Sequence, residues 1–317
     1  MEKDVHSALL PLPLFEGLSS TDYSVTRLGG LTNLVFRIEP QTEMARSALG
    51  GAVVARLPGA GTSDYIDRGV EVHNAAVAAR AGVSPHVLHA DPETGLMVSR
   101  FIDGAETMTP ENFANRPGSP ARAGRAFRKL HRSGLEFRFR FELFAMIADY
   151  LDVLATKDIT LPEGYHDIVR ASEPVRHALS ANPGTLAPCH CDPLCENFLD
   201  DGEMMWMVDW EYSGMNDPLW DLGDLSVEGG FNEQQDYEML SAWADGEPSA
   251  EDKARMVIYK AMCDLLWTLW GLIQHANDNP ADDFWAYAVN RFERCKALMA
   301  TAEFARHVEI IAAGGED

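Results

Sequence analysis

The chain has 317 residues, of which 46% are hydrophobic and 24% are charged, so its composition allows a packed core and excludes a disordered or collagen-like chain. Its 49 acidic residues outnumber 26 basic ones and give a formal net charge of −23. That charge repels nucleic acid and anionic membrane surfaces, and it tolerates a cationic ligand.

The sequence predicts neither a membrane span nor a secretory leader. No stretch approaches about 18 uninterrupted apolar residues, and the start, Met1 to Asp4, carries two acids where a leader has a basic region. The five cysteines are an odd number in a long chain, which disfavours a disulfide framework. We therefore expect a cytoplasmic protein with reduced thiols.

In chain order, the first hundred residues predict five short strands and one helix. Strands are expected at 23–28, 34–38, 51–57, 87–90 and 96–101, separated by turns rich in Gly, Pro and Asp. Apolar residues at 66, 70, 72, 75, 76 and 79 have helical spacing, which predicts a helix from Ile66 to Arg80 that Gly82 ends.

The pattern changes near residue 103, and almost everything after it is predicted to be helical, apart from a strand cluster between 185 and 209. One of these helices is crowded with Arg122, Arg125, Arg128, Lys129 and Arg132. A solvated helix face is the preferred interpretation, and a basic docking patch is the alternative. The chain is thus predicted to be α+β, with a sheet-rich N-lobe at 1–102 and a helical C-lobe at 103–317.

One segment has a pattern suited to phosphoryl transfer. It runs His190-x-Asp192-x4-Asn197 and continues into an apolar strand that ends at Asp209. Transfer of a phosphoryl group from ATP requires a carboxylate beside the acceptor hydroxyl and oxygen ligands for Mg²⁺. Kinases have the same Asp-x4-Asn spacing and a later metal-binding Asp. Asp192 is therefore the candidate base, Asn197 and Asp209 are the candidate metal ligands, and His190 is the candidate brace of the loop.

The same segment allows two other interpretations. It could be a surface loop with ordinary acids, which would make the full spacing a coincidence. Alternatively, Cys189, His190, Cys191 and Cys195 could bind zinc, but the first three are consecutive and no second Cys-x2-Cys knuckle appears. Small buried thiols beside a catalytic loop are the preferred interpretation.

The N-lobe supplies candidates for the nucleotide. Arg56, on the third predicted strand, could hold the phosphates, and Glu71 on the following helix could pair with it. The alternative for Arg56 is a half-buried side chain that covers the sheet with its stem. Gly29 and Gly30 form a hairpin tip that would allow the backbone to approach a phosphate.

These stretches together resemble the choline/ethanolamine kinase family, of the bacterial choline kinase type, within the aminoglycoside-phosphotransferase-like, protein-kinase-like fold. The matching stretches are 29–33, 54–59, 190–197 and 208–221, and the resemblance covers nearly the whole chain. It implies a two-lobed fold, with a small antiparallel-sheet N-lobe, and the cofactors ATP and Mg²⁺. It implies these nucleotide-binding residues: Gly29, Gly30, Thr32, Asn33, Arg56, Glu71, Phe101 and Ile102. Cys191 and Pro193 depart from the family pattern and leave the carboxylate of Asp192 intact.

The resemblance also implies a pocket for the acceptor alcohol. A quaternary ammonium has no N–H donor, so aromatic faces and a carboxylate hold it. The residues carried over to this pocket are Glu211, Tyr212, Trp267, Trp270, Trp285 and Tyr287. The alternative is that the tryptophans are core residues.

The implied activity is phosphorylation of choline or a related amino alcohol to give phosphocholine. Ethanolamine, thiamine and an aminoglycoside are alternative acceptors, and a non-catalytic nucleotide-binding regulator is the alternative of another class. The expected partner is a small cationic amino alcohol, without nucleic acid or membrane, and pairing as a homodimer is left open.

Overall fold

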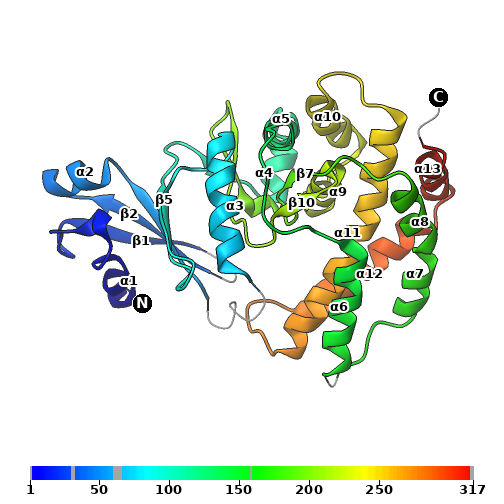
Figure 1. Ribbon diagram of the computed structural model, residues 1–317, viewed down its shortest axis with the longest axis horizontal. Helices are drawn as coiled ribbons and strands as arrows, with labels where there is room; N and C mark the ends of the chain where they lie inside the picture. Colours follow the sequence, from blue (N-terminus) through cyan, green and yellow to red (C-terminus); the bar gives the residue numbers. More distant parts are fainter. Residues whose placement is uncertain (1, 30–32, 60–65, 158, 315–317) are drawn as a thin grey trace.

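The computed structural model describes residues 2–29, 33–59, 66–157 and 159–314 and has two lobes side by side (Figure 1). The smaller lobe contains a five-stranded antiparallel sheet in the order β1-β2-β3-β5-β4. Its strands are β1 (Tyr23–Gly29), β2 (Leu34–Pro40), β3 (Val53–Leu57), β4 (Val87–Ala90) and β5 (Met97–Arg100). All five predicted strands are therefore confirmed to within a few residues.

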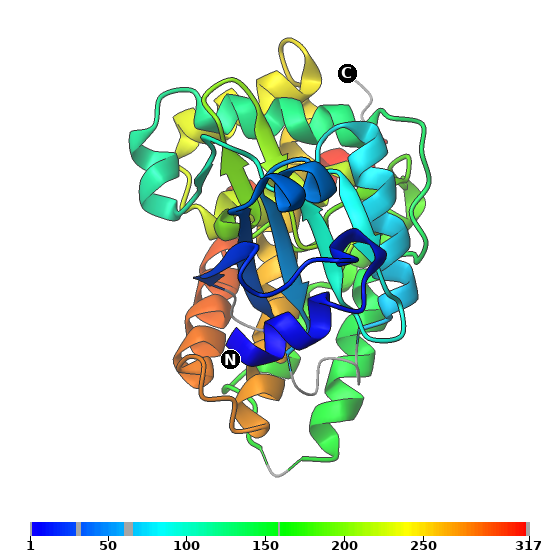
Figure 2. The same ribbon diagram turned by 90° about the vertical axis from the view of Figure 1, so that its left-hand side faces the viewer.

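The sheet uses its two faces differently. One face is covered by α1 (Glu2–Leu9), η1 (Pro13–Phe15) and α2 (Glu43–Leu49), which lie in front of it in Figure 2. Apolar spacing in the sequence did not predict α1 or α2. The side chains that pack against them are Phe36, Ile38, Val53, Ala55 and Val98. Because side chains alternate along a strand, Arg56 on β3 projects from the opposite face, toward the larger lobe.

The helix α3 (Arg68–Ala81) has a polar buried face. Asp67 caps its start, and Gly82, at φ +71, ends it in the left-handed conformation that favours glycine. The helix prediction is confirmed, and Ala75 of the predicted apolar stripe is buried in the core together with Val77 and Ala78. Arg68, Glu71 and Asn74 are buried, whereas Ala76 is exposed. The reason is that this face of α3 meets polar groups of the larger lobe, as described below.

The larger lobe is mainly helical. Its helices are α4 (Pro110–Asn115), α5 (Ser119–His131), α6 (Leu143–Ala155), α7 (Tyr165–Ala171), α8 (Glu173–Ala181), η3 (Cys195–Asn197), α9 (Pro218–Glu228), α10 (Glu233–Ala244), α11 (Ala250–Ala276), α12 (Phe284–Met299) and α13 (Ala302–Ala312). Its strands are β6 (Glu106–Thr107), β7 (Ala187–Cys189), β8 (Phe198–Asp200), β9 (Met205–Met207) and β10 (Gly214–Asn216). They form a three-stranded sheet, β6-β8-β9, and the pair β10-β7.

The helix α11 forms the centre of this lobe. Among the described residues it is the one helix long and apolar enough to cross a membrane, but 78% of its most apolar window is buried inside the protein. It packs against α6, α9, α12 and α13. Its apolar length therefore serves the core, and the burial of one long helix organises the C-terminal half of the chain.

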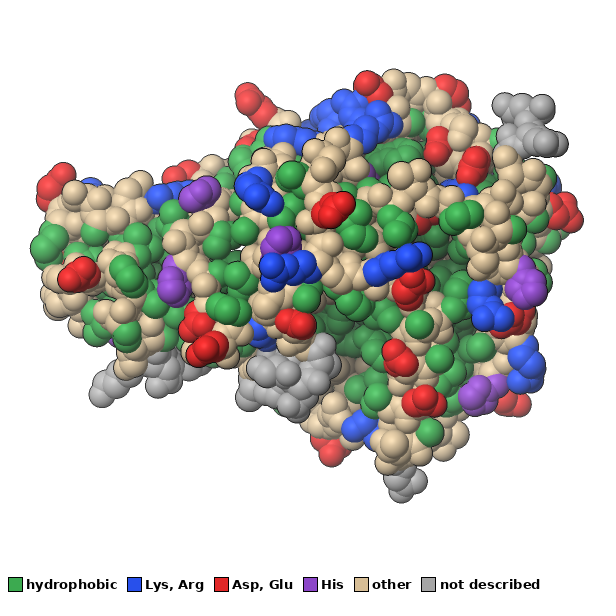
Figure 3. Space-filling view, viewed as in Figure 1, with side chains coloured by type: hydrophobic (Ala, Val, Ile, Leu, Met, Phe, Trp, Pro, Cys, Tyr) green, Lys and Arg blue, Asp and Glu red, His purple; other side chains and the backbone are tan. Residues whose placement is uncertain are grey.

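The basic helix α5 packs closely on α10. A Cβ added at Gly124 would overlap the carbonyl oxygen of Met239, so this contact needs a glycine. Basic side chains gather at the top of the molecule in Figure 3. Four of the five on this helix have partners within the chain: Arg122 with Asp200, Arg128 with Asp245, Lys129 with the carbonyl of Gly82, and Arg132 with the carbonyl of Trp243. These contacts support a structural role for this face over a docking patch.

Candidate active site

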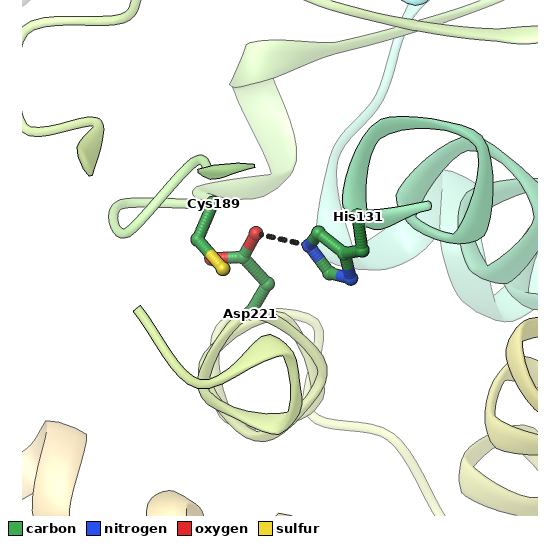
Figure 4. Close-up of side chains that lie close together, drawn as sticks. All are labelled: His131, Cys189 and Asp221. Carbon is green, nitrogen blue, oxygen red and sulfur yellow. Dashed lines mark hydrogen bonds and ion pairs between the residues drawn. The ribbon is translucent and has the colours of Figure 1, made fainter. Parts of the chain in front are cut away.

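A buried carboxylate holds the loop that follows β7. Asp221, on α9, accepts hydrogen bonds from the backbone N–H groups of His190 and Cys191, each at 2.8 Å. Cys191 has a left-handed φ of +66, which is strained for a residue with a side chain. His131 on α5 donates its Nε2–H to the same carboxylate at 2.9 Å (Figure 4). The two backbone hydrogen bonds fix the loop directly before Asp192, and His131 holds the carboxylate that accepts them.

The proposed zinc ligands do not gather around one point in the described part of the chain. His131, Cys189 and Asp221 do lie together, with potential ligand atoms within 4.8 Å of one another (Figure 4). However, both oxygens of Asp221 accept hydrogen bonds, and Trp243 donates to the second ring nitrogen of His131 at 3.0 Å. The cluster is therefore a hydrogen-bonded anchor for the loop.

His190 connects this loop to the strand that precedes Asp209. Its ring Nε2 donates to the backbone carbonyl of Val208 at 2.8 Å, and the side chain is buried. Burial lowers the pKa of His190, so the ring is neutral at physiological pH. The ring thus lies where a brace between the two segments is needed.

Asp192 and Asn197 face each other across the loop. Asn197 donates its Nδ2 to the backbone carbonyl of Asp192 at 3.0 Å. Because the nitrogen is used in this bond, the amide oxygen is the atom that could bind a cation. Burial raises the pKa of Asp192 well above its ordinary value, and the carboxylates of Asp224 and Asp209 add to the shift. A carboxylate with a raised pKa accepts a proton more readily, as a general base must.

Five charged side chains meet where the two lobes face each other. Arg56 donates to Asp209 at 2.7 Å and also pairs with Glu71. Arg68 donates to Glu71 at 2.7 Å and to Glu211 at 2.6 Å. The predicted Arg56–Glu71 pair is therefore present, but it belongs to a larger network. Arg68 was not predicted, although it lies three residues before Glu71 on the same helix face.

The carboxylates of this network suit a hard cation. Oxygens of Glu71, Asp209 and Glu211 all lie within 4.8 Å of one another, and an oxygen-only set favours Mg²⁺ over zinc. Burial raises the pKa of Asp209 to about 7, with Glu211 adding to the shift and Arg56 opposing it. Carboxylates crowded in this way are stabilised when a cation joins them. The residues present therefore fit a magnesium ion, with Asp209 among the candidate ligands.

The glycine hairpin is only partly described, because Gly30 and Thr32 lie outside the described residues. Gly29 ends β1 at φ +147, a conformation that favours glycine. Asn33 is buried, and its Nδ2 donates to Glu211 at 3.0 Å. Its Oδ1 has no hydrogen-bond partner among the described residues. Asn33 thus joins the hairpin to the carboxylate network.

The segment that connects the lobes carries the two expected hinge residues. Phe101 follows β5, and the guanidinium of Arg37 on β2 lies 4.2 Å from the centre of its ring. Ile102 comes next and is half-buried. The family resemblance implies that the stretch from Arg100 to Asp103 is the hinge near the adenine base.

Four of the predicted pocket aromatics form one cluster. Trp270 donates its indole N–H to the hydroxyl of Tyr212 at 3.0 Å and lies edge-on to Tyr287, with ring centres 5.8 Å apart. Trp267 lies edge-on to Tyr212 at 5.5 Å and donates to Asp224 at 3.0 Å. Trp267 is only 3% exposed, as a core residue would be, whereas Trp270 is half-buried.

Trp285 does not join this cluster. It is 37% exposed and packs against His275, with ring centres 5.6 Å apart. Trp285 and Tyr287 are two residues apart on α12, and such residues point to different sides of a helix. Phe284, which was not predicted, packs edge-on against Trp270 at 5.5 Å instead. We therefore drop Trp285 from the candidate pocket.

Two lobes of this kind, with an Asp-x4-Asn loop and a carboxylate network between them, define a small-molecule kinase of the protein-kinase-like fold. The chain belongs to the choline/ethanolamine kinase family, whose model matches residues 25–253.

Solved structures agree with this assignment. A choline/ethanolamine kinase family protein from Mesorhizobium loti is 60% identical, with a TM-score of 0.88 over 99% of both chains. Choline kinase LicA from Streptococcus pneumoniae is 26% identical, with a TM-score of 0.75 over 95% of this chain and 99% of that one. A LicA structure in complex with AMP is 26% identical, with a TM-score of 0.73 over 94% of this chain and 97% of that one. Aminoglycoside phosphotransferases, at 14% to 16% identity, share the fold.

Proposed function

We propose that this protein transfers the γ-phosphoryl group of ATP to the hydroxyl of choline, with Mg²⁺. One observation carries the proposal: Tyr212, Trp267, Trp270 and Tyr287 form one aromatic cluster in the lobe that carries the candidate base. Burial raises the pKa of the Tyr287 hydroxyl, and the neighbouring carboxylate of Asp192 adds to that shift. The ring that contacts Trp270 is therefore within electrostatic range of the group that would receive the substrate's proton.

Each of the candidate active-site residues has a separate role in this proposal. Asp192 orients the hydroxyl and accepts its proton as the oxygen attacks the terminal phosphorus. Arg56 places a positive charge where negative charge develops on the phosphate oxygens. Asn197 and Asp209 would hold Mg²⁺, which, when bound, supplies further neutralisation of the phosphates. The nucleotide is supported by the family membership and by the AMP found in a LicA structure.

Choline is favoured because the cluster offers ring faces to a cation. A quaternary ammonium is held by aromatic faces, worth up to about 2 kcal/mol when desolvated. Tyr212 and Trp270 are the candidates for such faces, because the guanidinium of Arg291 already lies 4.6 Å from the centre of the Tyr287 ring. The net charge of −23 attracts a cation over longer distances.

Ethanolamine is the second candidate, and a specific observation favours it. The carboxylate of Asp224, buried beside Trp267, could accept hydrogen bonds from a primary ammonium, which choline cannot donate. A comparison of choline with ethanolamine therefore tests whether the aromatic faces or the Asp224 carboxylate determine the substrate preference.

The test is a coupled assay of ADP release with Mg-ATP and four acceptors: choline, ethanolamine, thiamine and an aminoglycoside. We expect choline to give the highest kcat/KM and phosphocholine as the product. Asp192→Asn should lower kcat by at least about a thousandfold without a loss of thermal stability. Glu196→Gln, an exposed change in the same loop, is the matched control and should remain active.

Two results would contradict the proposal. If choline and ethanolamine release no more ADP than a blank, the acceptor is wrong. If the protein binds ATP tightly and transfers phosphate to no acceptor, the non-catalytic regulator is the better description.

A further inference from the structure

The side chain of Asn74 joins α3 to the larger lobe. It is fully buried, and its Oδ1 accepts the backbone N–H of Arg138 at 2.8 Å. Its Nδ2 donates to the backbone carbonyl of Arg138 at 3.1 Å, to that of Ser213 at 2.9 Å, and to the Ser213 hydroxyl at 3.1 Å. An amide side chain offers two acceptor and two donor positions, so this one is used almost completely.

The partner Ser213 closes the turn that begins at Asp209. Its backbone N–H donates to the carbonyl of Trp210 at 3.2 Å, and its hydroxyl donates to the same carbonyl at 2.6 Å. Asp209 has a left-handed φ of +68. The turn 209–213 thus starts at the strained residue Asp209 and ends at Ser213, to which Asn74 is hydrogen-bonded. The turn also carries Glu211.

The same face of α3 reaches this turn at a second point. Arg68, Glu71 and Asn74 recur every three residues, so their side chains line one side of the helix. Arg68 contacts Glu211, Glu71 contacts Arg56, and Asn74 contacts Ser213. One rigid helix therefore sets the position of the arginine on β3 and of the turn opposite to it.

We propose that Asn74 is a positioning residue that pins the 209–213 turn to α3. It fixes Asp209 and Glu211 relative to Arg56 before any ligand binds. Asn74 contacts backbone and Ser213 in the described structure, so it acts through the turn. Removal of its amide would take these partners from the backbone of Arg138 and from the buried carbonyl of Ser213, which loosens both segments. This inference goes beyond the proposed function, because it concerns the ligand-free protein and holds for any acceptor.

The direct test is hydrogen exchange, followed by mass spectrometry, on the full ligand-free chain. In Asn74→Ala we expect the amides of residues 210–215 to exchange at least about tenfold faster than in the wild type, since lost hydrogen bonds shift local opening by about that factor. Asn182→Ala is the matched control. Asn182 also donates to two backbone carbonyls, those of Ile311 and Ala312, but at the α8–α13 end of the larger lobe (Figure 1). It should leave residues 210–215 unchanged. Equal exchange of these residues in both variants would overturn the proposal.

A second measurement separates positioning from general stability. The Mg²⁺ concentration that gives half-maximal rate should rise about tenfold in Asn74→Ala and stay unchanged in Asn182→Ala. If Asn74→Ala does not fold, Asn74→Asp keeps the oxygen that accepts from the Arg138 N–H, removes the Nδ2 that donates to Ser213, and should show the same changes. A uniform loss of stability without faster exchange at 210–215 would contradict the proposal. If the wild type phosphorylates none of the acceptors, the exchange experiment still decides this point.

Discussion

Replacement of Trp270 by leucine tests the aromatic pocket most directly. Leucine keeps an apolar side chain on α11 but removes the ring face and the N–H that Tyr212 accepts. A desolvated cation–π contact is worth up to about 2 kcal/mol, and about 1.4 kcal/mol corresponds to a tenfold change. We therefore expect the KM for choline to rise by about thirtyfold, from the loss of the ring face alone.

The assay is initial rate against choline at saturating ATP, then against ATP at saturating choline. The KM for ATP should stay within about twofold, because Arg56 and Asp209 make no contact with Trp270 in the described structure. Trp285→Leu is the control, since this ring is 37% exposed and lies away from the cluster. A rise of less than about threefold in the choline KM, or an equal rise for ATP, would refute the reasoning.

Three further predictions concern stability. Arg68→Met leaves Glu211 buried with one cation fewer, so the free energy of unfolding should fall by about 3 kcal/mol in urea titrations, and an unchanged midpoint would contradict this. Burial raises the pKa of Asp224 to about 7, so the wild type loses stability as pH rises from about 4 to 7, whereas Asp224→Asn does not ionise. The stability of the variant relative to wild type should therefore be greater at pH 8 than at pH 5, by about 3 kcal/mol in the free energy of unfolding. A difference independent of pH would refute the shift. Gly124→Ala would force α5 away from the carbonyl of Met239 on α10. The free energy of unfolding, measured in urea, should fall by about 3 kcal/mol. A variant as stable as the wild type would show that α5 and α10 can separate without cost.

Local patterns were sufficient for much of the fold. The five strands of the smaller lobe were predictable because β-branched runs alternate with Gly, Pro and Asp turns. The Asp192 loop and Asp209 could be singled out in the sequence because the proposed chemistry requires a fixed spacing over a short stretch. The conformation at Cys191 was not, since it depends on Asp221, thirty residues further along the chain.

The buried face of α3 shows where local patterns fail. Apolar periodicity assumes that a helix meets an apolar core. Here one side of the helix meets a carboxylate turn 143 residues away from Arg68, so polar residues are buried on that side while Ala75, Val77 and Ala78 join the apolar core. The recurrence of Arg68, Glu71 and Asn74 every three residues was the signal that could have revealed this face. The position of Trp285 outside the pocket was not predictable for a related reason. The family motif gives the residue types, whereas the geometry of the helix determines the direction of each side chain.

The attachment of α3 has a consequence for how the two lobes can move relative to each other. In sequence the helix belongs to the smaller lobe, yet Arg68 and Asn74 fasten it to Glu211, Ser213 and Arg138 across the interface. A rotation of the whole smaller lobe would have to break these buried contacts. A rotation of the sheet alone would spare these contacts but would break the buried pair between Arg56 on β3 and Glu71, so α3 couples the motion of the sheet to that of the larger lobe.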